Sequence, residues 1–142
     1  MTLTHDRRAE LLGACRLFAG LGADELAAIA ARAVEIEFEP GHVIARVGEI
    51  GTGFFVVADG RVKVIRDGVE VANLGRGEFF GELSVIDGAP RNAQVITVEP
   101  TRCLGIASWD FEAMLLEQPT VTLAVLRAVV ARLREVTSDE RH

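Results

Sequence analysis

The sequence predicts a mainly β domain of the α+β class, with helices at both ends of the chain. The first and last thirds place apolar residues at helical intervals, whereas the middle carries short apolar or alternating runs separated by turn residues. Many short strands with regular turns favour a sandwich or a jelly-roll barrel. We therefore expect one domain over residues 1–142, with helices in 1–33, a β-barrel in 34–107 and helices in 108–142.

The N-terminal third is expected to form two helices, from Asp6 to Cys15 and from Ala23 to Ala33, on either side of a glycine break. The run from Val34 to Glu39 alternates strictly between apolar and acidic residues, which predicts a half-buried strand. Pro40-Gly41 then predicts a turn that ends this strand.

The barrel strands are predicted from apolar runs and the turns between them. Asp67-Gly68 lies between two alternating runs and is the strongest hairpin signal in the chain. The expected strands are Phe54–Ala58, Arg61–Arg66, Val69–Leu74, Gln94–Val98 and Arg102–Ala107.

Two helices are expected after the barrel. Ser108 is predicted to cap a helix that begins at Trp109. Pro119 suits the first turn of a longer helix, from about Thr120 to Val136, because proline lacks an N–H that the first turn leaves unpaired anyway.

The longer helix carries a coiled-coil-like seam, which predicts a homodimer through this helix. The seam residues are Leu126, Val129, Leu133 and Val136. The first half of the helix is apolar on nearly every side through Val121, Leu123, Val125 and Val130, so burial on more than one face is expected. The alternative is a helix folded wholly onto its own barrel as a lid.

Composition excludes several functions. A net charge of −6 disfavours nucleic-acid binding by this chain alone. The apolar runs are too short to span a membrane and the N-terminus lacks a signal peptide, so we expect a cytoplasmic protein. Cys15 and Cys103 are expected to be buried thiols. Three scattered histidines and the lack of a catalytic motif argue against a metal site and against an enzyme.

The most informative stretch is residues 80–95, which suits a small phosphorylated ligand. Backbone amides after Gly81 can face a phosphate at the start of a short helix. Arg91 can donate two charge-assisted hydrogen bonds to the same phosphate, and Glu82 can accept from a sugar hydroxyl. Ser84 and Asn92 can add side-chain hydrogen bonds.

These residues resemble the phosphate-binding cassette of the cyclic nucleotide-binding domains. The match covers Phe80–Ser84 and Pro90–Val95, and thus includes Leu83 and Ala93. Flanking segments are also similar to that family: Leu17–Leu21, Gly48-Glu49 and Gly53–Gly60. The resemblance implies a jelly-roll barrel in which Arg91 holds the cyclic phosphate and Glu82 the ribose 2′-hydroxyl.

The last helix adds a second resemblance. Ala131–Ser138 is similar to the central helix of the catabolite activator family, which implies that Thr137 holds the adenine amino group and Ser138 reaches the partner's nucleotide. Gln94 is a departure, because cyclic-GMP-selective kinases tend to place Thr there and cyclic-AMP-selective ones Ala. The choice between cAMP and cGMP therefore stays open at the base.

The resemblance implies a regulatory module that prefers cAMP and repositions its C-terminal helix against a separate protein effector, since no effector module follows in this sequence. The alternative is a barrel-fold interaction module that has lost or changed its nucleotide ligand.

Overall fold

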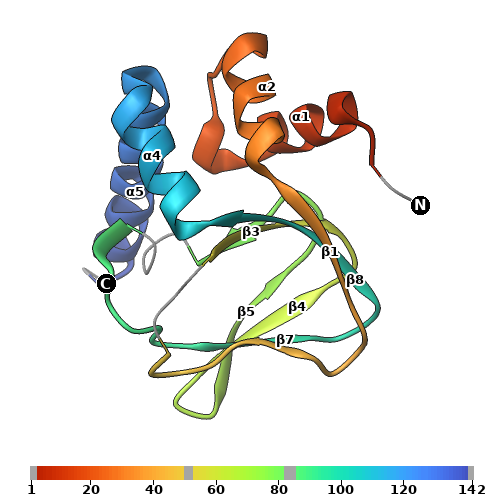
Figure 1. Ribbon diagram of the computed structural model, residues 1–142. Coiled ribbons are helices and arrows are strands. Elements are labelled where there is room, and N and C mark those ends of the chain that lie inside the picture. Colours follow the sequence, from red (N-terminus) through yellow and green to blue (C-terminus); the bar gives the residue numbers. More distant parts are fainter. Residues whose placement is uncertain (1–2, 50–52, 82–85, 141–142) are drawn as a thin grey trace.

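The computed structural model describes residues 3–49, 53–81 and 86–140 (Figure 1). The N-terminal helical part comprises α1 (His5–Ala14), the 3-10 helix η1 (Arg16–Phe18) and α2 (Ala23–Arg32). The strands are β1 (Val34–Phe38), β2 (Val43–Ala45), β3 (Gly53–Asp59), β4 (Val62–Arg66), β5 (Val69–Leu74), β6 (Phe79–Phe80), β7 (Gln94–Thr97) and β8 (Thr101–Ala107). The chain then continues as α4 (Ser108–Glu117) and α5 (Pro119–Glu140).

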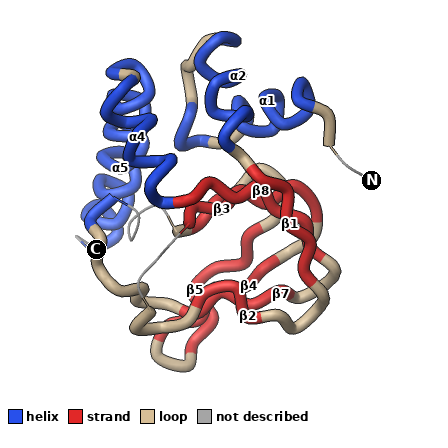
Figure 2. Tube along the Cα trace, viewed as in Figure 1, coloured by secondary structure: helices blue, strands red, loops and turns tan. Residues whose placement is uncertain are grey.

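The described strands form two four-stranded antiparallel sheets, in the orders β1-β8-β3-β6 and β2-β7-β4-β5. This arrangement confirms the jelly-roll prediction. Figure 2 shows the helices gathered on one side of the two sheets, and in the described part of the chain the opposite side of the sheets is free of helices.

Strand β3 is buried on both faces, which explains its unbroken apolar sequence. Phe54, Val56 and Ala58 pack against the helices in one hydrophobic cluster, together with Leu104 and Ile106 of β8. Val57 points the other way, into the barrel, where it packs with Val62, Phe80, Val95 and Cys103. Alternate residues of one strand therefore serve two cores, because successive side chains point to opposite faces.

The β4–β5 hairpin forms where its turn signal predicts it. Asp67 and Gly68 have φ values of 53° and 76°. Positive φ at both central residues is the signature of the type I′ turn, whose twist matches that of paired strands. Helices α1 and α2 also lie within one residue of their predicted ends, and Pro119 opens α5 as expected.

Two local predictions are wrong. Ser108 does not cap α4; it is the first helical residue, and Ala107 stands at the cap position without a side-chain hydrogen bond. The strict alternation of β1 also fails at its start, where Val34 is exposed and Glu35 is largely covered. Glu35 is drawn inward because its carboxylate accepts a hydrogen bond from the Leu3 backbone and lies beside Arg102.

The apolar residues of α5 divide between two faces. Val121 and Val125 are buried in the helical core, and Val129 of the predicted seam packs against the same core. The side chain of Val136 lies outside the described residues. The exposed apolar stripe of α5 consists instead of Leu123, Leu126, Val130 and Leu133, at helical steps of three and four.

Both cysteines are buried thiols, as expected. Burial raises the pKa of the Cys103 thiol to about 12, so it stays protonated in the barrel interior. Within the described part of the chain, no single helix is long and apolar enough to cross a membrane; α4 and α5 meet such a criterion only together, as a pair bent by 113°.

We predict that Phe54→Ala destabilises the protein by about 3–5 kcal/mol, because the side chain is fully buried where β3 meets the helices. Its ring contacts those of Phe18, Phe79 and Phe111 at centroid distances of 5.9, 5.9 and 5.4 Å. Urea unfolding measures the loss. The control, Val69→Ala on an exposed position of β5, should change stability by less than about 0.5 kcal/mol. Equal losses for the two variants would contradict the two-core account of β3.

Candidate functional site

Gly81 and Arg91 meet beside the first residue of β3. The Arg91 Nη2–H donates a hydrogen bond to the Gly53 carbonyl oxygen at 2.9 Å. Gly81 has a φ of +92°, and a Cβ added to it would lie 2.7 Å from the same carbonyl oxygen and 3.0 Å from Arg91 Nη1. A glycine is therefore required at position 81 both by its backbone conformation and by the close approach of the guanidinium.

The register of β6 on β3 places Gly81 at this point. Phe80 pairs with Phe55 across the two strands, and their rings stack with centroids 5.1 Å apart. Gly81 follows Phe80 directly, so the chain leaves the sheet next to Gly53.

The backbone of Arg91 is held separately from its side chain. The Arg91 N–H donates to the Glu49 carbonyl oxygen at 2.7 Å, and the Gly48 N–H donates to the Arg91 carbonyl oxygen at 2.9 Å. This pair of bonds ties the start of the β7 segment to the loop after β2. The Arg91 side chain is thus aimed from a backbone fixed on both sides, as a binding arginine requires.

A cavity of about 290 Å³ opens beside these residues. Its volume is close to the lower end of the roughly 300–1000 Å³ typical of small-molecule sites. The cavity is lined by residues from β2, β4, β5, β6, β7 with the segment before it, and α5. They are Ala45, Val64, Arg66, Val71, Ala72, Leu74, Phe79, Phe80, Gly81, Arg91, Asn92, Ala93, Val95 and Arg132.

The cavity combines apolar walls with positive charge. Three of the described lining residues are arginines, Arg66, Arg91 and Arg132, and none of the described lining residues is acidic. Such a site suits a ligand with one anionic end and a flat or apolar body, because the guanidinium groups can hold the anion while the rest of the ligand is taken out of water.

Four of the predicted site residues are brought together in this cavity: Gly81, Arg91, Asn92 and Ala93. Glu82, Leu83 and Ser84 lie outside the described residues. Thr137 and Ser138 belong to α5, but their side chains also lie outside what the structure describes. The roles predicted for these five residues therefore stay predictions.

Gln94 was wrongly expected at the base end of the site. It does not line the cavity, whereas its neighbours Ala93 and Val95 do. The reason is the alternation of β7, which turns every second side chain away from the barrel interior. Asn92, and not Gln94, is the polar amide side chain of this segment that lines the cavity.

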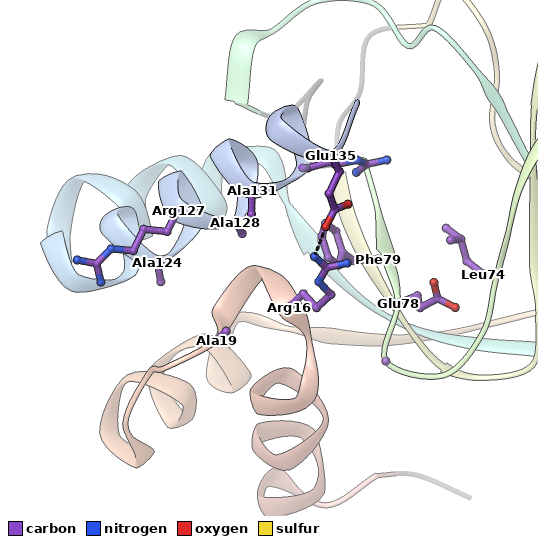
Figure 3. A pocket seen from close by; sticks show the side chains of 12 residues that line it. Arg16, Ala19, Leu74, Glu78, Phe79, Ala124, Arg127, Ala128, Ala131 and Glu135 are labelled. Atoms are coloured by element: carbon purple, nitrogen blue, oxygen red, sulfur yellow. Dashed lines mark hydrogen bonds and ion pairs between the residues drawn. The ribbon is translucent and has the colours of Figure 1, made fainter. Parts of the chain in front are cut away.

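A larger cavity of about 540 Å³ lies elsewhere, between η1, the β5–β6 segment and α5 (Figure 3). Neither Gly81 nor Arg91 lines it. We assign the ligand site to the smaller cavity, because only there do the glycine and the arginine of residues 80–95 converge. The two cavities share three lining residues: Leu74, Phe79 and Arg132.

Comparison with known proteins agrees with this geometry. Residues 35–118 match the family model described as the cyclic nucleotide-binding domain. The chain belongs to this family.

Among curated proteins, this cyclic nucleotide-binding domain is 27% identical over 135 residues to the CRP-like cAMP-activated global transcriptional regulator of Mycobacterium tuberculosis. The match covers 92% of this chain and 60% of that protein, so the chain spans about three fifths of the relative's length.

Two solved structures are similar to the whole domain. The catabolite activator protein of Thermus thermophilus superposes with a TM-score of 0.81 at 30% identity, covering 89% of this chain and 62% of that one. The N-terminal domain of a transcriptional regulator from Streptomyces coelicolor A3(2) superposes with a TM-score of 0.77 at 33% identity, covering 91% and 93%.

Arg66 and Arg132 are cavity residues that the sequence did not single out. Arg66 lies two residues after Val64 on β4, and strand alternation puts the two on one face. The spacing of Val64 and Arg66 could therefore have indicated from the sequence that Arg66 faces the same way as Val64. No comparable signal marks Arg132, because its approach to the cavity depends on how α5 crosses the barrel.

We predict that Gly81→Ala weakens cyclic-nucleotide binding at least about tenfold, because the new Cβ displaces the Arg91 guanidinium. Gly77→Ala is the matched control: Gly77 has a φ of +85°, yet a Cβ there meets nothing within 4 Å. Both variants should lose about 1–2 kcal/mol of stability from the left-handed backbone, and Gly81→Ala more, because its Cβ also meets the Gly53 carbonyl oxygen; only Gly81→Ala should lose affinity. Calorimetric titration compares them, and equal affinities would refute the role assigned to the close approach.

Proposed function

We propose that this chain is a cyclic-nucleotide-binding regulatory module that prefers cAMP and signals by repositioning α5 against a separate protein effector. The proposal is ligand binding and not catalysis. The observation that carries it is the convergence of Gly81 and Arg91 on a cavity whose wall includes Arg132 of α5. Ligand site and signalling helix are therefore in direct contact.

The chemistry of the cavity supports a cyclic nucleotide. A cyclic phosphodiester carries one negative charge, which the Arg91 guanidinium can bind through two parallel donors. The sugar and base then face the apolar walls formed by Val64, Leu74 and Val95. Glu82 at the ribose and Thr137 at an adenine complete the predicted contacts.

The preference for cAMP is supported by the relative from Mycobacterium tuberculosis, which is named as cAMP-activated. Gln94 is the residue at which this sequence departs from both cAMP-selective and cGMP-selective kinases. Because it does not line the cavity, it gives no argument against cAMP. A ligand shifts the equilibrium between two positions of α5 only by the difference in its affinity for those positions. A ligand contact with Arg132, which α5 carries, would supply such a difference.

The test is a calorimetric panel of cAMP, cGMP, AMP and a cyclic dinucleotide. We expect cAMP to bind most tightly and AMP, which has an open phosphate, to bind worse. Arg91→Ala should weaken cAMP binding by about 2 kcal/mol or more, because a buried charge loses its partner. Arg7→Ala, an exposed arginine of α1, should bind like the wild type. A flat response to the whole panel would favour the alternative, a barrel module that has lost or changed its ligand.

We further propose that the exposed stripe of α5 forms a homodimer. Leu123, Leu126, Val130 and Leu133 make an apolar face that an isolated chain would leave in water. Ser138 would then reach the nucleotide bound by the partner.

Leu126→Glu should convert the dimer into a monomer, because it places a charge in the centre of the stripe. Leu116→Glu, on an exposed position of α4 away from the stripe, should leave the dimer intact. Light scattering after size-exclusion chromatography gives the mass. A wild-type monomer with and without cAMP would exclude the dimer.

A further inference from the structure

The two halves of α5 are held in different ways. Val121 and Val125 in the first half are buried in the helical core beside Phe111 and Met114 of α4. The residues 131–135 in the second half are all exposed. Packing therefore fixes the start of the helix, while another interaction must set the position of its later turns.

From Ala128 to Glu135, α5 passes over the larger cavity, and only Ala128 and Val129 of these residues also pack against the helical core. Ala124, Ala128 and Ala131 line this cavity from the helix side, and Ala19 and Phe79 line it from the opposite side (Figure 3). Small side chains leave an open volume of about 540 Å³ beneath the helix. A helix over a cavity can shift without the cost of overpacking that a close-packed core imposes.

An ion pair bridges the helix to the body of the protein at this cavity. The Arg16 Nη2–H donates to Glu135 Oε1 at 2.9 Å, and Figure 3 shows the two side chains reaching toward each other from η1 and α5. Arg16 stands on a rigid base, because the next two residues, Leu17 and Phe18, are almost completely buried.

The same stretch of α5 forms part of the nucleotide cavity. Arg132 lies one helical turn before Glu135 and lines both cavities. Because Arg132 and Glu135 lie one turn apart on the same helix, a shift of Glu135 relative to η1 would also move Arg132 relative to the nucleotide cavity. The other charged residues that line the larger cavity are Glu78 and Arg127, and the Glu78 carboxylate accepts a hydrogen bond from the Gly75 N–H in its own turn.

We propose that Arg16 and Glu135 are a positioning pair that holds the later turns of α5 over the nucleotide cavity and thereby raises ligand affinity. The inference rests on the proposed function, to which it adds two residues that touch no ligand. Both side chains are exposed, 73% and 59%, so the pair acts as a modest adjustment and weakens as salt rises.

A double-mutant cycle tests the pair. Arg16→Ala and Glu135→Ala should each weaken cAMP binding about two- to fivefold at low salt, and the double variant should bind no worse than either. The reversed pair, Arg16→Glu with Glu135→Arg, should recover most of the loss, which a merely structural effect of either residue would not do. Arg7→Ala is the matched control, because it breaks the Arg7–Glu10 ion pair of similar exposure on α1.

Amide hydrogen exchange of the ligand-free protein gives a second readout that needs no nucleotide. Exchange over residues 127–135 should speed up in both single variants and return to the wild-type rate in the reversed pair. If the wild type binds no cyclic nucleotide but exchange responds in this way, the proposed function fails together with the effect on affinity, and only the role of the pair in holding α5 stands. If cAMP binds equally to the wild type and the single variants, or the reversed pair restores nothing, the positioning proposal is overturned.

Discussion

Burial of β3 on both faces is the constraint on which the rest of the structure depends. The strand lies between the helical core and the barrel interior, and its alternate residues belong to one or the other. A shift of β3 by one residue would turn the side chains of the helical core into the barrel and those of the barrel into the helical core, because successive side chains of a strand point to opposite faces. Its register therefore fixes both neighbours, β8 on one side and β6 on the other.

The ligand site follows from that register. Pairing of Phe80 with Phe55 carries the chain to Gly81 beside the start of β3, where the Gly53 carbonyl oxygen accepts from Arg91. The site thus rests on backbone atoms of a strand that is buried on both faces. The hydrogen bond to Gly53 holds the Arg91 guanidinium in place before a ligand arrives. Such preorganisation lowers the entropy cost of binding. The opposite wall is different in kind, because Arg132 is carried by the exposed half of α5. In the proposed function, the Gly53–Arg91 side of the cavity stays fixed while α5 moves, and this difference would couple ligand binding to helix position.

Sequence reasoning was most reliable where the signal is local. The Asp67-Gly68 turn, the ends of α1 and α2, and Pro119 at the start of α5 all depend on the conformational preferences of adjacent residues. It failed where distant contacts override such preferences. Glu35 turns inward to meet Arg102 and the Leu3 backbone, Val129 packs on the core, and Gln94 turns away from the cavity. For Glu35 and Val129 the deciding partner lies far away in the sequence, whereas Gln94 follows the alternation of its own strand.

The sequence by itself determined the family, the order of the longer helices and of six of the eight described strands, and the glycine and arginine that meet at the cavity; the short strands β2 and β6 were not predicted. These depend on short motifs whose chemistry is carried by neighbouring residues. Only the tertiary structure decided which side chains complete the site. Arg66 and Arg132 enter the cavity because the barrel and α5 place them there, and Arg16 meets Glu135 across 119 positions of the chain. Contacts of that range arise from the packing of whole elements, which no local pattern of residues encodes.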